Sequence, residues 1–193
     1  MTQPGLAWVT LAALLGAASL LAWFMPTVWL DWQPALATHQ PWRCWSAAFV
    51  HWSPLHLGAN LFGTLLVGAL GRVGRVPWPT TLAWFVAWPL LHLALLAQPA
   101  LAHYGGLSGV LHAGVAAAAV EIALTDRGQP RLIGLLLLGG LLLKIVLETP
   151  WGAPLRHPAD WDIAIAPLAH TTGALAGATL ALLAHALTSR PKP

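Results

Sequence analysis

Three short segments carry side chains that together could perform nucleophilic acyl transfer. The stretch HYGGLSGVLHAG, residues 103–114, places Ser108 among glycines at the start of a long apolar run. HWSPLHLGAN, residues 51–60, and AHTTGALAG, which contains His170, lie in two further apolar runs. A serine hydroxyl becomes a nucleophile when a neighbouring base takes its proton, and histidine is a base near neutral pH. We therefore interpret Ser108 as a nucleophile and His170 as its general base.

Helical spacing predicts how these side chains meet. His56 and Asn60 are four residues apart, as are Ser108 and His112, so each pair shares one face of a helix. Ser108 lies near the outer end of its helix and His170 roughly 10 Å into its own, and these depths are compatible. Backbone N–H groups at the start of the span that carries Ser108, and the side chains of His56 and Asn60, could donate to the oxyanion that acyl transfer generates.

The composition places these helices in a membrane. Of 193 residues, 58% are hydrophobic and 8% are charged, and the mean hydropathy is +0.69. An apolar run of about 20 residues is long enough to cross a hydrocarbon core as a helix. The sequence predicts an all-α membrane protein with a single domain over residues 1–193. Its six predicted spans are about 5–25, 55–71, 78–97, 106–124, 131–148 and 163–187.

The distribution of Lys and Arg predicts the orientation, because positive charge collects in cytoplasmic loops. One side of the membrane would hold Arg72, Arg75, Arg127, Arg131, Arg190 and Lys192, and the other Arg43 and Arg156. We expect both termini in the cytoplasm, and the loops 26–54, 98–105 and 149–162 on the outer side with the site. The net charge of +3 follows from this bias, so no nucleic-acid partner is expected.

Two ridges of small residues at a spacing of four would let the helices of Ser108 and His170 pack closely. One ridge is Gly109, Ala113 and Ala117, and the other is Ala169, Gly173, Gly177 and Ala181. We expect Gly173 and Gly177 to allow the last span to approach the fourth.

No carboxylate in the sequence is an evident partner for the base. Glu121 is thirteen residues beyond Ser108, which is about 20 Å along a helix, too far to orient His170. Asp160 and Asp162 fall in the loop before the last span. We therefore favour a Ser-His dyad over a triad.

The other polar residues have simpler interpretations. Lys144 and Glu148 are four residues apart and are expected to neutralise each other, with contact to a substrate as the alternative. Cys44 is the single cysteine, which excludes an internal disulfide and a cysteine-based metal cage. No metal and no cofactor are expected.

The same segments resemble the signatures of the rhomboid intramembrane serine proteases. PWRCW includes Trp42 and Arg43, and HWSPLHLGAN resembles the H-x4-H-x3-N pattern of the family's second helix. GLSG surrounds Ser108, and AHTTGALAG follows an A-H-x2-G-x3-G pattern. The four elements occur in the family's order on a six-helix topology, between residues 42 and 177.

The resemblance implies a six-helix, rhomboid-like bundle with assigned roles. Ser108 would be the nucleophile, and His170 the general base and acid. His56, Asn60 and the Ser108 N–H would form the oxyanion hole. Gly173 and Gly177 would bring the two catalytic helices together.

Within that family the chain looks most like the rhombosortase branch. It is small, has a GLSGVLHA segment in the fourth span, and carries His112 where many rhomboids have tyrosine. This resemblance implies a multi-pass protein of the bacterial inner membrane with its site on the periplasmic side. Its substrates would be exported proteins with a C-terminal anchor made of a Gly-Gly motif, one transmembrane helix and a basic tail.

His112 has two interpretations. Its ring could pack against His170 and fix the orientation of that base, which is the interpretation we favour. Because helical side chains lean towards the N-terminus, His112 could also reach the Ser108 hydroxyl and transfer its proton.

Two other classes of protein remain as alternatives. Several intramembrane histidines could ligate haem in a helical bundle. A rhomboid-like protein could also bind membrane proteins without cutting them, although such a protein usually lacks the nucleophile or the base, and both are present here.

Overall fold

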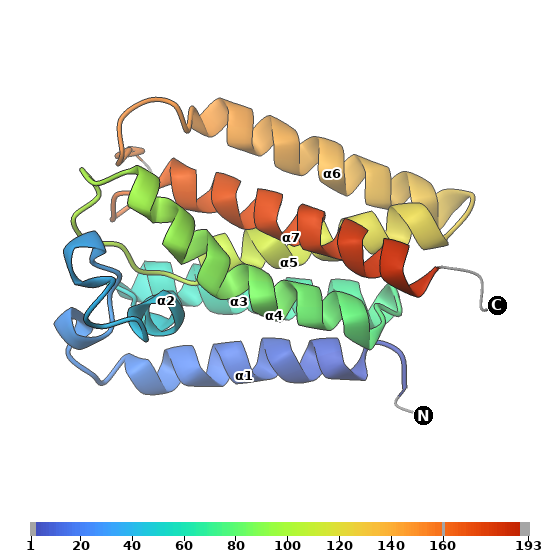
Figure 1. Cartoon of the computed structure of the whole chain (residues 1–193), viewed down its shortest axis with the longest axis horizontal. Helices are drawn as coiled ribbons and strands as arrows, with labels where there is room; N and C mark the ends of the chain where they lie inside the picture. The colour runs from blue at the N-terminus through green and yellow to red at the C-terminus, as the bar shows by residue number, and fades with distance from the viewer. Residues whose placement is uncertain (1–2, 160, 190–193) are drawn as a thin grey trace.

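The computed structural model of the chain describes residues 3–159 and 161–189 (Figure 1). In this part of the chain the protein is a bundle of six long helices without β-strands. They are α1 (Leu6–Ala22), α3 (Pro54–Val73), α4 (Trp78–Ala94), α5 (Ser108–Thr125), α6 (Gln129–Glu148) and α7 (Pro167–Thr188). The short helix α2 (Arg43–Ser46) lies in the first long loop. Asp160, Arg190 and Lys192 fall outside the described residues.

The helices have the length and hydropathy of membrane spans. Five stretches, α3, α5, α6, α7 and α4 with its extension to Ala97, are long and apolar enough to cross a bilayer, and α1 is a shorter apolar helix of 17 residues. The all-α prediction is therefore confirmed. The observed bounds differ from the predicted ones by a few residues at most ends.

Proline sets where four of the helices begin. Each of α3, α4, α6 and α7 has a proline in its first two positions. Proline is favoured there because its fixed φ suits the helix and its missing N–H would have no partner in the first turn. In α3 the side chain of Ser53 also accepts a hydrogen bond from the His56 N–H, at 3.0 Å, which caps the helix.

The last helix begins four residues later than the sequence suggested, at Pro167 rather than 163. The residues before it belong to the loop 149–166, where Arg156 and Ile165 exchange two backbone hydrogen bonds of 2.9 and 2.8 Å. Proline also disfavours a helical conformation in the residue that precedes it. His170 consequently lies in the first turn of α7 instead of 10 Å along it.

The positions of α5 and α6 in the bundle differ sharply. Thirteen of the 18 residues of α5 are buried, so this helix forms the centre of the bundle. Of the 20 residues of α6, only Gly134 is buried, and Figure 1 shows α6 along the upper edge of the bundle. Most of the surface of α6 is therefore left for lipid.

Candidate active site

Ser108 and His170 meet at one end of the bundle. Ser108 is the first residue of α5, and His170 lies in the first turn of α7. The distance between Ser108 Oγ and His170 Nε2 is 2.9 Å, which is a hydrogen bond. The structure thus brings together the two side chains on which the sequence interpretation depends.

The ridges of small residues explain why the two helices come this close. A Cβ atom on Gly173 would lie 2.1 Å from the carbonyl oxygen of Gly109, and one on Gly177 would lie 2.2 Å from that of Ala113. Neither site has space for a side chain, so α7 packs with its backbone against that of α5. This contact fixes the distance between Ser108 and His170.

The expectation that no carboxylate reaches His170 is wrong. Glu148 Oε2 lies 2.7 Å from His170 Nδ1, and Lys144 Nζ donates a hydrogen bond to Glu148 Oε1. The pair of Lys144 and Glu148 expected from their spacing is present, but Glu148 has a second partner on another helix. Helical spacing could not reveal that partner, because the loop 149–166 folds back before α7 begins.

Glu121 occupies the distant position expected for it. Its carboxylate accepts hydrogen bonds from Thr80 Oγ1 and Thr125 Oγ1, both at 2.8 Å. It belongs to the packing of α4 against α5 near the other end of the bundle.

His112 supports the ring of His170 from one side. The two rings are stacked, with centroids 4.1 Å apart and planes within 6° of each other. His112 Nδ1 lies 2.7 Å from the backbone carbonyl oxygen of Ser108. Since a carbonyl only accepts hydrogen bonds, this nitrogen carries the proton, and the contact with Ser108 is through its backbone instead of Oγ.

A cavity of about 470 Å³ lies beside the Ser108 hydroxyl. His56 and Asn60, the two oxyanion candidates on α3, both line it, as do His170 and Glu148. The loop 149–166 forms its opposite wall through Leu155, Pro158, Trp161, Ile163, Ala164 and Ile165. The cavity is large enough to hold several waters and part of a polypeptide.

Gly106 fits the ring of His56 against the segment that precedes Ser108. Its φ is +129°, a backbone angle that residues with a side chain rarely adopt. A Cβ atom at this position would also lie 2.8 Å from His56 Nε2. On the other side of His56 lies the ring of His51, with centroids 4.7 Å apart. Burial lowers the pKa of His51, which lies in the loop before α3, to about 4, so this histidine is neutral at physiological pH.

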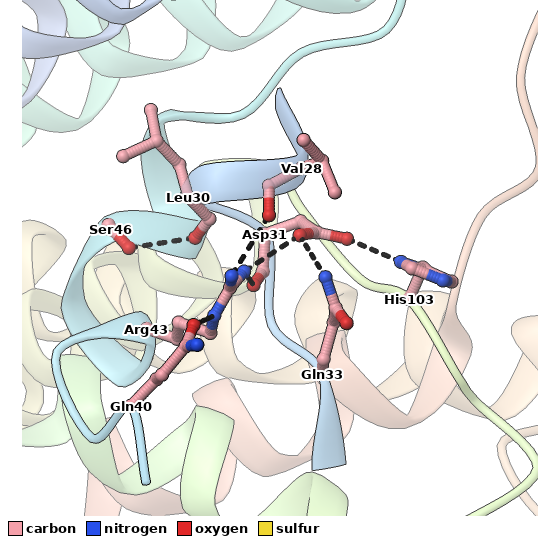
Figure 2. Close-up of polar contacts among 8 residues, drawn as sticks. All are labelled: Val28, Leu30, Asp31, Gln33, Gln40, Arg43, Ser46 and His103. Atoms are coloured by element: carbon pink, nitrogen blue, oxygen red, sulfur yellow. Dashed lines mark hydrogen bonds and ion pairs between the residues drawn. The ribbon is translucent and has the colours of Figure 1, made fainter. Parts of the chain in front are cut away.

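The first long loop also holds the segment before Ser108 in place. Figure 2 shows Arg43 and Asp31 at the centre of this contact, with Arg43 Nη1 2.9 Å from Asp31 Oδ1. Arg43 also donates to the Val28 carbonyl oxygen at 2.9 Å and to Gln40 Oε1 at 2.6 Å. The other carboxylate oxygen of Asp31 lies 2.6 Å from His103 Nδ1, five residues before the nucleophile.

Backbone pairing strengthens the same connection. Trp32 and Tyr104 exchange two backbone hydrogen bonds, of 2.7 and 2.9 Å. The Tyr104 hydroxyl lies 3.4 Å from the carbonyl oxygen of Gly106, and Tyr104 is one of the residues that line the cavity. Burial raises the pKa of Tyr104 to about 12.

Sequence reasoning missed Asp31 and Tyr104 as parts of the site. A signal for each was present. Asp31 and Arg43 are the only acidic and basic residues, histidines aside, between residues 23 and 53, and Tyr104 is the only tyrosine of the chain. One opposite pair of charges in an otherwise uncharged loop indicates a contact between them.

The arrangement of the described histidines differs from that of a metal site or a pair of haem ligands. Among residues 3–159 and 161–189, no group of three or more His, Cys, Asp or Glu side chains is suited to hold a metal ion. His112 and His170 are stacked face to face, whereas two axial haem ligands direct their nitrogens at one iron from opposite sides.

The fold and the site define an integral membrane protein, a helical bundle with a serine and a histidine hydrogen-bonded beside a cavity at one end. Residues 38–187 match the family model of the rhomboid domain. The chain therefore belongs to the rhomboid family, whose members are generally intramembrane serine proteases. No match was found among curated proteins.

Proposed function

We propose that this protein is an intramembrane serine endopeptidase that cleaves transmembrane or C-terminally anchored exported proteins. The observation that carries the proposal is the 2.9 Å hydrogen bond between Ser108 Oγ and His170 Nε2 beside the cavity. A catalytically silent binder of membrane proteins would have no need for a nucleophile and base held in this geometry.

The reaction follows from the positions of the groups. Ser108 Oγ attacks the carbonyl carbon of the scissile bond and passes its proton to His170 Nε2. The carbonyl electron pair moves to oxygen, and the intermediate collapses as the leaving amine takes the proton from His170. Water then attacks the acyl-enzyme, gives a proton to His170, and releases the new carboxylate while Ser108 recovers its proton.

The oxyanion that forms in both steps requires donors. The N–H of Ser108 lies at the N-terminus of α5, where the helix dipole favours negative charge. The side chains of His56 and Asn60 line the same cavity and supply N–H groups. We assign these three groups to the oxyanion hole.

We propose that the site faces the outside of the bacterial inner membrane and that both termini are cytoplasmic. Arg72, Arg75, Arg127 and Arg131 lie in or beside the connections at the end of the bundle opposite Ser108. Figure 1 places both ends of the described chain at that same end. The proposed orientation agrees with the preference of positive charge for the cytoplasm.

We further propose a rhombosortase-like specificity for Gly-Gly anchors. An apolar groove of about 440 Å³ between α3, α5 and α6 reaches Ser108 and includes Gly63, Leu66, Leu137 and Gly140. A transmembrane helix lying along this groove would bring the residues at its outer end to the nucleophile. Glycines at that end unfold readily from a helix and pass easily through a narrow site.

The test is co-expression with an exported protein that carries a Gly-Gly anchor, followed by the mass of the released product. Ser108→Ala and His170→Ala should each lower the rate of release at least about 1,000-fold. Labelling of purified protein at Ser108 by a fluorophosphonate distinguishes an enzyme from a silent binder. Labelling without release of this substrate would reject the Gly-Gly specificity alone, whereas absence of labelling would reject the proposed enzyme.

A further inference from the structure

We propose that Glu148 is a positioning residue that holds His170 in the tautomer and orientation needed to take the proton of Ser108, which makes the site a Ser-His-Glu triad. This inference rests on the proposed function, because it concerns how the same nucleophile is activated. It adds to that function a residue that neither helical spacing nor the family signatures indicate.

The hydrogen bonds of His170 define its tautomer. A carboxylate only accepts hydrogen bonds, so the 2.7 Å contact with Glu148 Oε2 places the imidazole proton on Nδ1. The lone pair is then on Nε2, which faces Ser108 Oγ. An imidazole without this partner could carry its proton on Nε2 instead, where it cannot accept the serine proton.

The charge of Glu148 matters at the moment of proton transfer. When His170 takes the proton it becomes an imidazolium, in a place where its side chain is 8% exposed. A buried cation without a partner is costly. Glu148, whose side chain is 13% exposed, provides an adjacent negative charge that stabilises the imidazolium.

Local helix preferences do not explain this glutamate. Glu148 is the last residue of α6, where the helix dipole disfavours negative charge. Lys144 precedes it by four residues, which is the less favourable order for a helical ion pair. Contacts at the end of α6 nevertheless fix the position of Glu148. Thr149 ends the helix in a left-handed conformation, and Arg156 Nη1 donates a hydrogen bond to the Leu147 carbonyl oxygen at 2.8 Å.

The competing explanation is that Glu148 only neutralises Lys144. Both contacts involve the same carboxylate, so a single substitution of Glu148 removes both. A double-mutant cycle separates them. If Glu148 served only Lys144, replacing Lys144 as well would restore the activity that Glu148→Gln loses.

The experiment measures the rate of fluorophosphonate labelling at Ser108 in purified protein, as a maximal rate and an apparent binding constant. We expect Glu148→Gln to lower the maximal rate at least about 100-fold, in line with the loss of the acidic member of serine protease triads. The binding constant should change less than about threefold. Glu148→Asp keeps the charge and should recover part of the rate.

The matched control is Glu121→Gln, which neutralises a buried carboxylate near the other end of the bundle and keeps one oxygen that can accept a hydrogen bond from Thr80 or Thr125. Its labelling rate should stay within about threefold of the wild type. The double variant Lys144→Met, Glu148→Gln should label as slowly as Glu148→Gln alone. Thermal midpoints in detergent confirm that the variants compared are folded.

The outcomes separate this inference from the proposed function. Wild-type protein that labels at Ser108, with Glu148→Gln labelling equally fast or rescued by Lys144→Met, would overturn the triad alone. Wild-type protein that does not label would overturn both. Nitrogen NMR of the wild-type His170 ring provides a measurement without variants, and a proton on Nε2 would also reject the triad.

Discussion

At the scale of single residues, His170 is constrained on three sides. Ser108 Oγ contacts Nε2, Glu148 contacts Nδ1, and the ring of His112 covers one face. An imidazole held in this way has neither a free choice of tautomer nor freedom to rotate. Substitution of each contacting residue should therefore measure its separate contribution to the reaction rate.

We predict that the face contact of His112 is more important than its nitrogens. His112→Phe keeps an aromatic ring against His170, whereas His112→Ala removes it, and stacked rings contribute about 0.5–1.5 kcal/mol. His112→Ala should therefore lower the cleavage rate about 2- to 12-fold more than His112→Phe. A His112→Phe protein as inactive as His170→Ala would instead assign the proton transfer to His112.

We predict an unusual titration for the single tyrosine. Burial raises the pKa of Tyr104 from 10.0 to about 12, so its hydroxyl should stay neutral well above pH 10 in the folded protein. Near-ultraviolet absorbance against pH measures this ionisation directly, because no other tyrosine contributes. The unfolded chain is the control and should titrate at the ordinary value of about 10.

The same shift has a consequence for stability. Between the two pKa values the folded state binds more protons than the unfolded state, so the free energy of unfolding falls as the pH rises from about 10 to about 12. Tyr104→Phe should remove this part of the alkaline destabilisation. Equal alkaline destabilisation of both proteins would contradict the prediction.

At the scale of elements, the sequence predicted the contact between α5 and α7 well. The small residues recur at the helical spacing of four, and each glycine of α7 lies against a backbone carbonyl of α5. Such a contact requires residues without large side chains, and these residues can be identified from the sequence alone. The start of α7 was less predictable, because residues 163–166 are as apolar as the helix that follows.

We predict that Gly177→Ala destabilises the bundle by about 1–3 kcal/mol, as expected for overpacking. The new Cβ would meet the Ala113 carbonyl oxygen at 2.2 Å, and a backbone atom cannot move aside as a side chain can. Denaturant unfolding in mixed micelles gives the free energy. Gly139→Ala on α6 is the control, since no atom lies within 4 Å of its Cβ position, and an equal loss in both variants would contradict the prediction.

The conformation of the first long loop depends on the buried ion pair of Asp31 and Arg43. Asp31 and Arg43 are 3% and 4% exposed, and removal of one charge from a buried pair costs about 3–5 kcal/mol. Asp31→Asn should therefore loosen the loop. Cys44, which follows Arg43 in the sequence, should then become accessible to a thiol reagent. Burial raises the pKa of the Cys44 thiol, so maleimide should react slowly with wild-type protein and much faster with the variant.

His103→Ala is the matched control for that measurement. This substitution removes the His103 side chain, which is 59% exposed and contacts Asp31. It should change the free energy of unfolding by less than about 1 kcal/mol. Slow maleimide reaction in Asp31→Asn would show that the other hydrogen bonds of Arg43 are sufficient to hold the loop.

At the scale of the whole molecule, the number and order of the helices followed from hydropathy, and the level of Ser108 followed from the start of its span. Glu148 did not follow, because its contact with His170 crosses from one helix to another at their ends. The sequence feature that could have indicated this contact is the depth of Glu148 in the membrane. Glu148 ends its helix at the same side of the membrane at which Ser108 begins its own.

The exposure of α6 relates the site to the surrounding lipid. Glu148 lies at the end of α6, in which only Gly134 is buried, so few side chains of this helix are held by its neighbours and a mismatch with the bilayer thickness can act on its position. A bilayer with shorter or longer acyl chains would shift Glu148 relative to His170. Labelling rates of the wild-type protein should therefore vary with acyl-chain length, and those of Glu148→Gln should vary less.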